Sequence, residues 1–186
     1  ISVSKNISVS KNDHQMNVKA NNTKYGETST FEIILPSDAT GTVTVNVDGK
    51  SDSKTLKNGK TTLEINGLAK GDYDYVLNYS GDDKYESDTQ SNKISVGKTE
   101  TSFEVSLINN IHVDDSANFI IYGLPIDATG KIMVTINNIQ SDFANVTNGK
   151  ASISIKMVAD GFYTAKVSYF DDENYTVMLF DLYNEI

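Results

Sequence analysis

The chain has no cysteine and no tryptophan, and none of its basic residues is arginine. Without cysteine and tryptophan, it cannot form the disulfide and buried indole that hold together the two sheets of antibody-type domains. This absence does not indicate the cytosol, because an extracellular domain needs no disulfide when its strands bury enough apolar area. The sequence also has no apolar run of membrane-spanning length and no signal-peptide pattern. We therefore expect no direct membrane insertion by these residues.

Positive charge is scarce as well: 16 basic residues stand against 25 acidic ones, which gives a formal net charge of −9. Nucleic acids and anionic membrane surfaces attract proteins that carry a basic stripe, and they repel an acidic chain. We therefore expect no nucleic-acid partner. The sequence begins abruptly at Ile1, and we interpret it as a fragment of a longer protein.

One stretch occurs twice, at residues 71–85 and again at residues 161–175. Each copy opens with Gly-x-Tyr, continues with alternating apolar side chains to a second Tyr, and passes an acidic turn to a third Tyr. Alternation is the period of a half-buried strand, since successive side chains point to opposite faces. Two copies of one element at a fixed spacing predict two modules of about ninety residues each.

Both modules contain the same turn signals between short alternating segments. Pro36-x-Asp-Ala-Thr-Gly41 returns at residues 125–130, and the type I′ hairpin pair Asn58-Gly59 returns at residues 148–149. We expect about seven short antiparallel strands in each module, including an edge-like piece at residues 54–57, and no helix. The predicted fold is all-β, with one β-sandwich per module.

The ends of the modules follow from a hexamer, Ile-Ser-Val-Ser-Lys-Asn, which is written twice in residues 1–12 and returns in part at residues 94–98. We predict that residues 1–12 are a lead-in or the tail strand of a preceding repeat. The first module then covers residues 13–96 and the second residues 97–186. The final segment of the second module is far more apolar than that of the first. It is either a more deeply buried closing strand or an exposed patch for a neighbouring module or partner.

The Gly-x-Tyr of each repeat fits a tyrosine corner, in which a tyrosine hydroxyl bonds to backbone a few residues upstream. The tyrosines in question are Tyr73 and Tyr163. A tyrosine corner is structural, so we expect neither residue to bind a ligand.

The acidic turns are the candidate metal sites, because Ca²⁺ takes six to eight oxygen ligands. They lack the spaced, glycine-hinged run of an EF-hand loop, and solvated carboxylates are common next to strand ends. We expect no cofactor, with Ca²⁺ as the one alternative. Its candidate ligands are Asp82, Asp83, Asp171, Asp172 and Glu173.

Catalysis finds few candidate residues. His14 and His112 lie in different modules and in polar sequence surroundings. There is no cysteine, no serine in a nucleophile-elbow setting and no glycine-rich phosphate loop. We therefore expect that the protein is not an enzyme.

Two covalent modifications have candidate residues. Asn-x-Ser/Thr, the pattern that accepts N-linked glycans, occurs at Asn6, Asn21, Asn78, Asn145 and Asn174, of which Asn174 is best placed in a turn. An isopeptide crosslink would need a buried lysine beside a carboxylate or amide. Lys19 and Asn92 lie on strands that are close in a sandwich, but the alternation of β-strand side chains predicts that Lys19 points outward.

The sequence motifs of the repeats resemble those of a known family. Leu-Pro-x-Asp-Ala-Thr-Gly, Asn-Gly-Lys, Gly-x-Tyr and above all residues 79–85, Tyr-Ser-Gly-Asp-Asp-Lys-Tyr, are similar to the bacterial-type Ig-like repeats of adhesin-like surface proteins of methanogenic archaea. The second module departs from the pattern with Phe170-Asp171 in place of Ser80-Gly81.

The resemblance implies two tandem Ig-like β-sandwich domains on a cell surface, acting as a stalk or an adhesive segment. Expected partners are an unknown protein or glycan on another cell, and neighbouring Ig-like repeats of the same chain. Two alternatives stay open: a spacer that calcium makes rigid, and a carbohydrate-binding accessory module, which would show exposed aromatic rings in a row.

Overall fold

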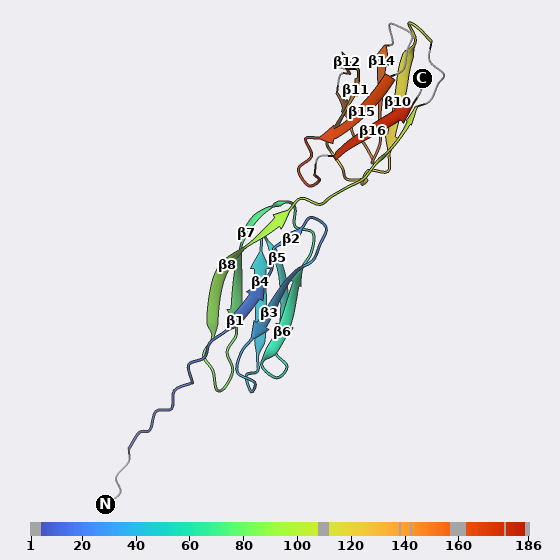
Figure 1. Cartoon of the computed structure of the whole chain (residues 1–186). Helices are drawn as coiled ribbons and strands as arrows, with labels where there is room; N and C mark the ends of the chain where they lie inside the picture. The colour runs from blue at the N-terminus through green and yellow to red at the C-terminus, as the bar shows by residue number, and fades with distance from the viewer. Residues whose placement is uncertain are drawn as a thin grey trace, which may run out of the picture. The chain divides into compact units, whose positions relative to one another are not determined.

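The computed structural model describes residues 5–107, 112–137, 139–141, 143–156, 163–176 and 178–184. The chain divides into two compact units, Ile1–Gly97 and Lys98–Ile186, each of which has its own sheets (Figure 1). The predicted boundary after residue 96 lies one residue before this division. In the described part of the chain, no helix is long and apolar enough to cross a membrane.

The first unit has two sheets. One has the order β1-β3-β6 and the other the order β2-β8-β7-β4-β5. All pairs are antiparallel except β2 with β8, which pair in parallel through Thr23 with Val96 and Lys24 with Gly97. The strands are β1 (Asn17–Ala20), β2 (Thr23–Lys24), β3 (Ser29–Ile34), β4 (Thr42–Val47), β5 (Lys50–Thr55), β6 (Lys60–Ile65), β7 (Gly71–Tyr79) and β8 (Asp88–Gly97).

Alternating side chains from both sheets fill the core of the first unit. On β7, Tyr75, Leu77 and Tyr79 are buried, whereas Asp74 and Asn78 are exposed and Val76 is partly buried. The Phe31 ring of β3 meets the Tyr75 ring edge to face, with the ring centroids 4.9 Å apart. The period of two that the sequence predicts is therefore confirmed, since each inward residue packs against the opposite sheet.

The second unit repeats this architecture. One sheet has the order β14-β10-β9, and the other has the order β12-β11-β15-β16 with β13 also paired to β11. Its core includes Phe119 of β10, Val134 of β11 and Tyr169 of β15, all buried. The strands are β9 (Glu104–Leu107), β10 (Ser116–Tyr122), β11 (Lys131–Ile136), β12 (Ile139–Gln140), β13 (Ala144–Asn145), β14 (Ala151–Lys156), β15 (Tyr163–Phe170) and β16 (Met178–Asn184).

The all-β prediction is confirmed, but two details of the first unit differ from it. The described part of the unit has eight strands, where about seven were expected, because the loop after β1 contains a short strand, β2, which leaves β1's sheet and pairs with β8. Of the edge-like piece predicted at residues 54–57, only Lys54 and Thr55 belong to a strand: they end β5, which pairs with β4 from Lys50 to Thr55.

The residues before the first strand carry the hexamer, for which a lead-in and a tail strand of a preceding repeat both stay open. Residues 5–11 form no strand, and Ile7 and Val9 are 85% and 90% exposed. Regular structure begins at Asn12, which makes a single parallel bridge with Tyr85. An isolated strand has no partner for its backbone groups, so within this chain the segment stays extended and solvated.

Candidate functional site

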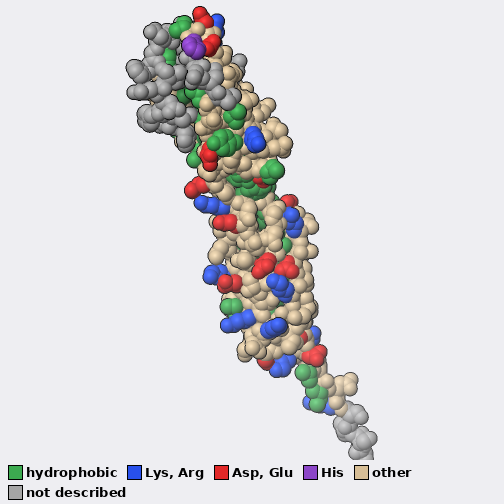
Figure 2. Space-filling model, turned by 90° about the vertical axis from the view of Figure 1, so that its right-hand side faces the viewer, with side chains coloured by type: hydrophobic (Ala, Val, Ile, Leu, Met, Phe, Trp, Pro, Cys, Tyr) green, Lys and Arg blue, Asp and Glu red, His purple; other side chains and the backbone are tan. Residues whose placement is uncertain are grey.

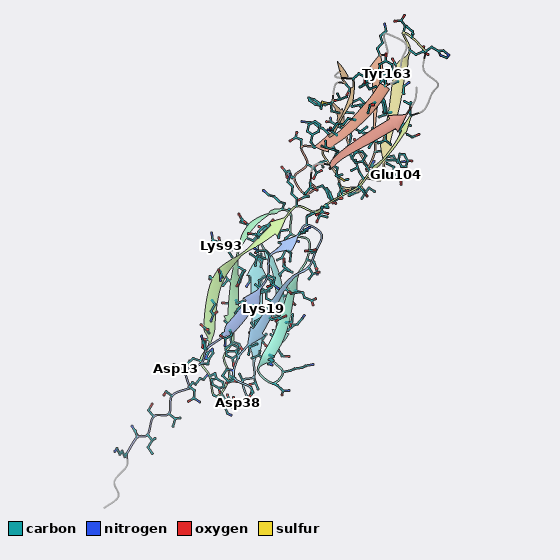
Figure 3. The ribbon with its side chains drawn as sticks, viewed as in Figure 1. Asp13, Lys19, Asp38, Lys93, Glu104 and Tyr163 are labelled. Carbon is teal, nitrogen blue, oxygen red and sulfur yellow. The ribbon has the colours of Figure 1, made fainter. Side chains whose placement is uncertain are left out.

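The acidic turn between β7 and β8 lies at one end of the first unit, where it meets the loop between β3 and β4. Figure 3 labels Asp38 of that loop at the same end as Asp13, close to where the chain enters the unit. The second unit has the same pair of segments, the turn between β15 and β16 and the loop between β10 and β11. These turns carry the candidate metal ligands and are the natural place to look for chemistry.

One aspartate of the first turn points inward and bonds to backbone on both sides. Asp82 Oδ2 accepts hydrogen bonds from the N–H and hydroxyl of Thr40, at 2.7 and 3.0 Å. Its Oδ1 accepts from the N–H groups of Lys84 and Tyr85, both at 2.8 Å. We call these contacts, and their counterparts in the second unit, the carboxylate clamp. The clamp joins the turn to a loop some forty residues earlier in the chain.

The two tyrosines that flank the turn strengthen the clamp. The Tyr79 hydroxyl donates to the Thr40 carbonyl at 2.8 Å, and the Tyr85 hydroxyl donates to Asp38 Oδ1 at 2.8 Å. Asp38 also pairs with Lys84, with 2.6 Å between Oδ2 and Nζ. Asp38 of the Pro-x-Asp-Ala-Thr-Gly loop therefore anchors Tyr85 and Lys84.

The second unit holds the same clamp, more deeply buried. Asp172 is only 4% exposed. Its Oδ2 accepts from the N–H groups of Thr129 and Gly130 and from the Tyr169 hydroxyl, at 2.7, 3.0 and 2.7 Å. Its Oδ1 accepts from the N–H groups of Asn174 and Tyr175, both at 2.8 Å.

The remaining contact of the second clamp also matches the first. The Tyr175 hydroxyl donates to Asp127 Oδ1 at 2.8 Å, as Tyr85 does to Asp38. Corresponding residues of the two modules therefore make corresponding bonds, except that the Tyr79 hydroxyl donates to the Thr40 carbonyl whereas the Tyr169 hydroxyl donates to Asp172 Oδ2.

These donors set the charge state of both aspartates. Burial raises the pKa of Asp172, but the Tyr169 hydroxyl and three backbone N–H groups outweigh burial and lower the pKa to about 2. Backbone N–H groups, that of Thr40 first, hold the pKa of Asp82 well below its ordinary value. Burial and the Asp82 carboxylate raise the pKa of Tyr79 to about 12. Each clamp is therefore a carboxylate held ionised beside a neutral tyrosine, which is a structural arrangement.

Glycine at the end of the loop makes room for the clamp. A Cβ on Gly41 would lie 2.7 Å from the Gly81 carbonyl oxygen, and Gly41 has a φ of +92°. A Cβ on Gly130 would lie 2.5 Å from the Tyr169 ring and 2.7 Å from the Phe170 carbonyl oxygen. The loop and the turn thus approach more closely than any side chain would allow.

The chain entering each unit is fastened to the same turn. Asn12 donates its N–H to the Lys84 carbonyl at 2.7 Å. In the second unit, Thr99 donates to the Asn174 carbonyl at 2.9 Å, and Thr176 donates to the Thr99 carbonyl at 3.0 Å. The clamp therefore fixes the position of the incoming chain as well as the loop.

The clamp bears on the calcium hypothesis. The inward carboxylates, Asp82 and Asp172, already accept at least four hydrogen bonds each, whereas Asp83 and Glu173 are exposed. Asp171 is exposed and pairs with Lys131, with 2.6 Å between Oδ2 and Nζ. Among the residues that the structure describes, no three His, Asp or Glu side chains gather in a way that could hold a metal ion.

Tyr73 makes the bond that defines a tyrosine corner. Its hydroxyl donates to the Ala69 carbonyl, four residues upstream, at 3.0 Å. The corresponding Tyr163 begins β15 and is partly buried. The Gly161 and Phe162 of its motif lie outside the described residues.

The two histidines and Lys19 have different surroundings in the structure. The His14 ring is not in polar surroundings: it meets the Tyr79 and Tyr85 rings edge to face, with centroids 5.3 and 5.8 Å away. His112 is exposed and lies 3.1 Å from Asp115. The Lys19 side chain points outward, 3.7 Å from Glu32, and so has no place in an internal crosslink.

The candidate glycan acceptors lie at different depths. Asn21 is exposed after β1, and Asn145 is exposed on β13. Asn78 is exposed on β7, where its Oδ1 accepts from the Thr89 hydroxyl at 3.0 Å. Asn174 is partly buried, because its N–H and carbonyl both bond within the clamp region.

The outer face of the larger sheet is where the units differ most. In the first unit, hydroxyl and amide groups meet across the strands: Thr44 bonds to Ser53 at 2.8 Å, and Thr89 bonds to Asn78. Ser80 accepts from the Thr42 N–H at 3.0 Å. The polar groups of this face therefore form hydrogen bonds with one another.

The second unit has apolar side chains at the corresponding positions. Met133 and Leu179 flank Ser168 across three strands, and the Phe170 ring meets the Phe143 ring with centroids 5.4 Å apart. Leu179 is 57% exposed and Phe143 63% exposed. Figure 2 shows several hydrophobic side chains on the described part of the second unit, whereas the side chains coloured on the first unit are mainly charged. Leu179 favours the exposed patch predicted for the last strand, while the side chains of residues 180–184 lie outside the described set.

Sequence reasoning found the acidic turns but not their partners in the preceding loop. Thr40 and Asp38, with Thr129 and Asp127 in the second unit, complete the clamp. A signal was present: Pro-x-Asp-Ala-Thr-Gly and the paired tyrosines occur together in both modules. Because the two motifs occur together in both modules, contact between them in the fold is expected.

Comparison with known proteins agrees with this architecture. Residues 16–97, the first unit, match the family model of the bacterial Ig-like domain (group 3). No curated protein sequence matches the chain.

Solved structures show the fold. A segment of two fibronectin type III domains from chicken tenascin has a TM-score of 0.52 at 13% identity, covering 92% of this chain and 100% of that one. Two further likenesses have TM-scores too low to carry an argument. One is a Ca²⁺-stabilised adhesin of an Antarctic bacterium (0.37, 17% identity, 92% of this chain and 48% of that one). The other is a β-glucuronidase of Parabacteroides merdae (0.33, 14% identity, 92% of this chain), of which the chain spans only 24%.

Proposed function

We propose that this chain is a non-enzymatic segment of an adhesin-like cell-surface protein, in which the two Ig-like modules act as a stalk, an adhesive segment or both. The observation that carries the proposal is the carboxylate clamp, which recurs in both units with corresponding donors and acceptors. The outer faces of the larger sheets, in contrast, have diverged from polar to apolar. The modules of a tandem array must fold in the same way while contacting different neighbours or partners. A clamp common to both units, combined with different outer sheet faces, meets both needs.

Two further observations support this role. The first unit matches a bacterial Ig-like domain, and the repeats resemble those of adhesin-like surface proteins of methanogenic archaea. The net charge of −9 keeps such a chain soluble and unattracted to anionic membranes. The proposed location is extracellular, with a protein or glycan of another cell as partner and glycans on exposed asparagines such as Asn21 and Asn145.

The carbohydrate-binding alternative predicts a row of exposed aromatic rings. Among the described residues, Tyr122 and Phe143 are the aromatic side chains of highest exposure, at 36% and 63%. Tyr122 ends β10 in the smaller sheet, and Phe143 precedes β13 in the larger one, so the two rings do not form a row. Recognition of a sugar by stacking is thus less well supported than adhesion or spacing.

The test has two parts. Antibodies against the fragment are applied to intact and to permeabilised cells of the source organism, and labelling of intact cells is expected. Beads coated with the fragment are then incubated with intact cells. The matched variant replaces the apolar face of the second unit by the residues of the first, as Met133→Thr, Phe143→Ser, Phe170→Ser and Leu179→Thr.

Each result has a defined meaning. Binding by the wild type that the variant loses supports an adhesive segment, and no binding by either supports a stalk. Labelling confined to permeabilised cells would overturn the surface role altogether.

A further inference from the structure

An open groove separates the edge strands β5 and β6 of the first unit, where the two sheets part at the side of the sandwich. The groove has a volume of about 560 Å³. Its lining is entirely hydroxyl-bearing or basic: Ser53, Lys54, Thr55, Lys57, Lys60, Thr61 and Thr62. Three ammonium groups therefore gather at one place on a chain whose net charge is −9.

Two of these lysines face each other without a neutralising partner. Lys57 and Lys60 flank the Asn58-Gly59 turn and bond to each other through their backbones, N–H to carbonyl, at 2.9 and 3.1 Å. Their side chains therefore leave the hairpin on one face, where like charges directly opposite destabilise it. Within the described residues, neither ammonium group forms an ion pair. A bound anion would relieve the repulsion between the two ammonium groups.

The third lysine has a structural task. Lys54 Nζ donates to the Thr62 carbonyl at 2.8 Å and lies 3.5 Å from Asp52. Asp52 in turn accepts from the Glu64 N–H at 2.9 Å. Lys54 and Asp52 thus link β5 to β6 through hydrogen bonds and compensate each other's charge. Lys57 and Lys60 are the groove lysines that form no ion pair within the described residues.

The second unit lacks this groove chemistry although it keeps the turn. Thr147 takes the place of Lys57, and Ala144 that of Lys54. Thr147 and Lys150 still bond through their backbones at 2.8 and 3.1 Å. The hairpin therefore does not require the facing lysines for folding, and their presence in the first unit has another reason.

We infer that the groove between β5 and β6 of the first unit binds an acidic polysaccharide, holding a carboxylate or sulfate group between Lys57 and Lys60 while the surrounding hydroxyls bond to the sugar. Ammonium groups supply charge-assisted hydrogen bonds to such anions. Serine and threonine hydroxyls both donate to and accept from sugar hydroxyls. The inference deepens the proposed function, on which it rests for its biological sense, by naming a class of surface ligand.

The experiment titrates the full chain, labelled with ¹⁵N, with three sets of oligosaccharides while backbone amide signals are followed by NMR. Galacturonic acid oligomers test carboxylates, heparin-derived oligomers test sulfates, and glucose oligomers are the neutral control. The diagnostic variant is Lys57→Thr, which installs the residue that the second unit carries in the same turn. Lys60→Gln is the second variant. Lys93→Thr removes the same charge from β8, three strands away from β5 in the larger sheet.

We expect shifts confined to residues 53–62 with one or both anionic sets, and their loss at about 0.5 M NaCl because salt screens exposed charges. Each groove variant should weaken binding at least about threefold, whereas Lys93→Thr should leave it unchanged. Binding of only one anionic set identifies the anion. The inference is overturned if neither anionic set shifts these residues, if glucose oligomers do so equally, or if Lys57→Thr binds as the wild type does. Because purified chain and defined sugars are used, such a failure leaves the surface role standing.

Discussion

Replacing Asp172 by asparagine should lower the unfolding free energy of the second unit by much more than a single surface substitution would. An asparagine has one oxygen where aspartate has two. Whichever way its amide is turned, the NH₂ group faces backbone N–H donors, either those of Thr129 and Gly130 or those of Asn174 and Tyr175. A buried donor left without an acceptor costs about 1–3 kcal/mol, so two of them give an expected loss of about 2–6 kcal/mol. That is a large part of the 5–15 kcal/mol, roughly, that stabilises a domain of this size.

The assay is urea unfolding of the full chain, followed by NMR because the signals of the two units can be resolved. The first unit serves as the internal reference, and its transition should not move. Asp171→Asn is the matched control: it makes the same chemical change at the adjacent residue but loses only an exposed ion pair with Lys131, which solvent screens. Equal losses for Asp171→Asn and Asp172→Asn would refute the clamp as a source of stability.

The pH dependence of the same variant gives an independent check. The pKa of Asp172 in the folded unit is about 2, below the ordinary value of 3.8. Its stabilisation is therefore fully present above the ordinary value and is lost as the pH falls through the folded one. The difference in unfolding free energy between wild type and Asp172→Asn should shrink by about 2 kcal/mol from pH 6 to pH 2. A difference that is the same at both pH values would contradict the assigned charge state.

Further predictions concern the packing around the clamp and the corner. Gly130→Ala should destabilise the second unit by about 1–3 kcal/mol in the same urea assay, because a Cβ there meets the Tyr169 ring at 2.5 Å; no change would mean that the loop yields freely. Tyr73→Phe removes the hydroxyl bond to the Ala69 carbonyl, and the first unit should lose about 0.5–1.5 kcal/mol while the second is unaffected. A loss smaller than the error of the measurement would show that the corner bond contributes nothing.

The repeat and the strand pattern were readable from the sequence because they depend on local chemistry. Alternation placed Tyr75, Leu77 and Tyr79 on the core face of β7, and burial confirms it. Asn58-Gly59 predicted a type I′ hairpin, and both residues have positive φ, +51° and +69°. Each of these features is decided by residues within a few positions of one another.

The clamp was not readable in the same way, because it depends on which acidic side chain turns inward. Asp82 and Asp83 are adjacent and chemically alike, yet only Asp82 meets the loop. The backbone decides this: the preceding residue, Gly81 or Asp171, has a positive φ of 71° or 59°. Composition alone made both residues candidate metal ligands, and only the long-range contact with Thr40 separates them.

The lead-in shows the opposite case, in which a strand-like sequence pattern is not accompanied by a strand. The hexamer has the alternation of a strand, but residues 5–11 form none in this chain. A strand requires a partner for its backbone groups, and propensity does not supply one. The sequence pattern therefore described what the segment is able to do rather than what it does here.

The central claim is that the acidic turns are structural clamps and not metal sites, and thermal unfolding with and without calcium tests it most directly. The melting temperatures of both units should be the same, within about 1 °C, in about 10 mM CaCl₂ and in excess EDTA, because the inward carboxylates already have their donors. A ligand at about 100 times its dissociation constant adds about 2.7 kcal/mol to the stability of the folded state. A rise of several degrees with calcium would therefore contradict the clamp and favour a calcium-rigidified spacer.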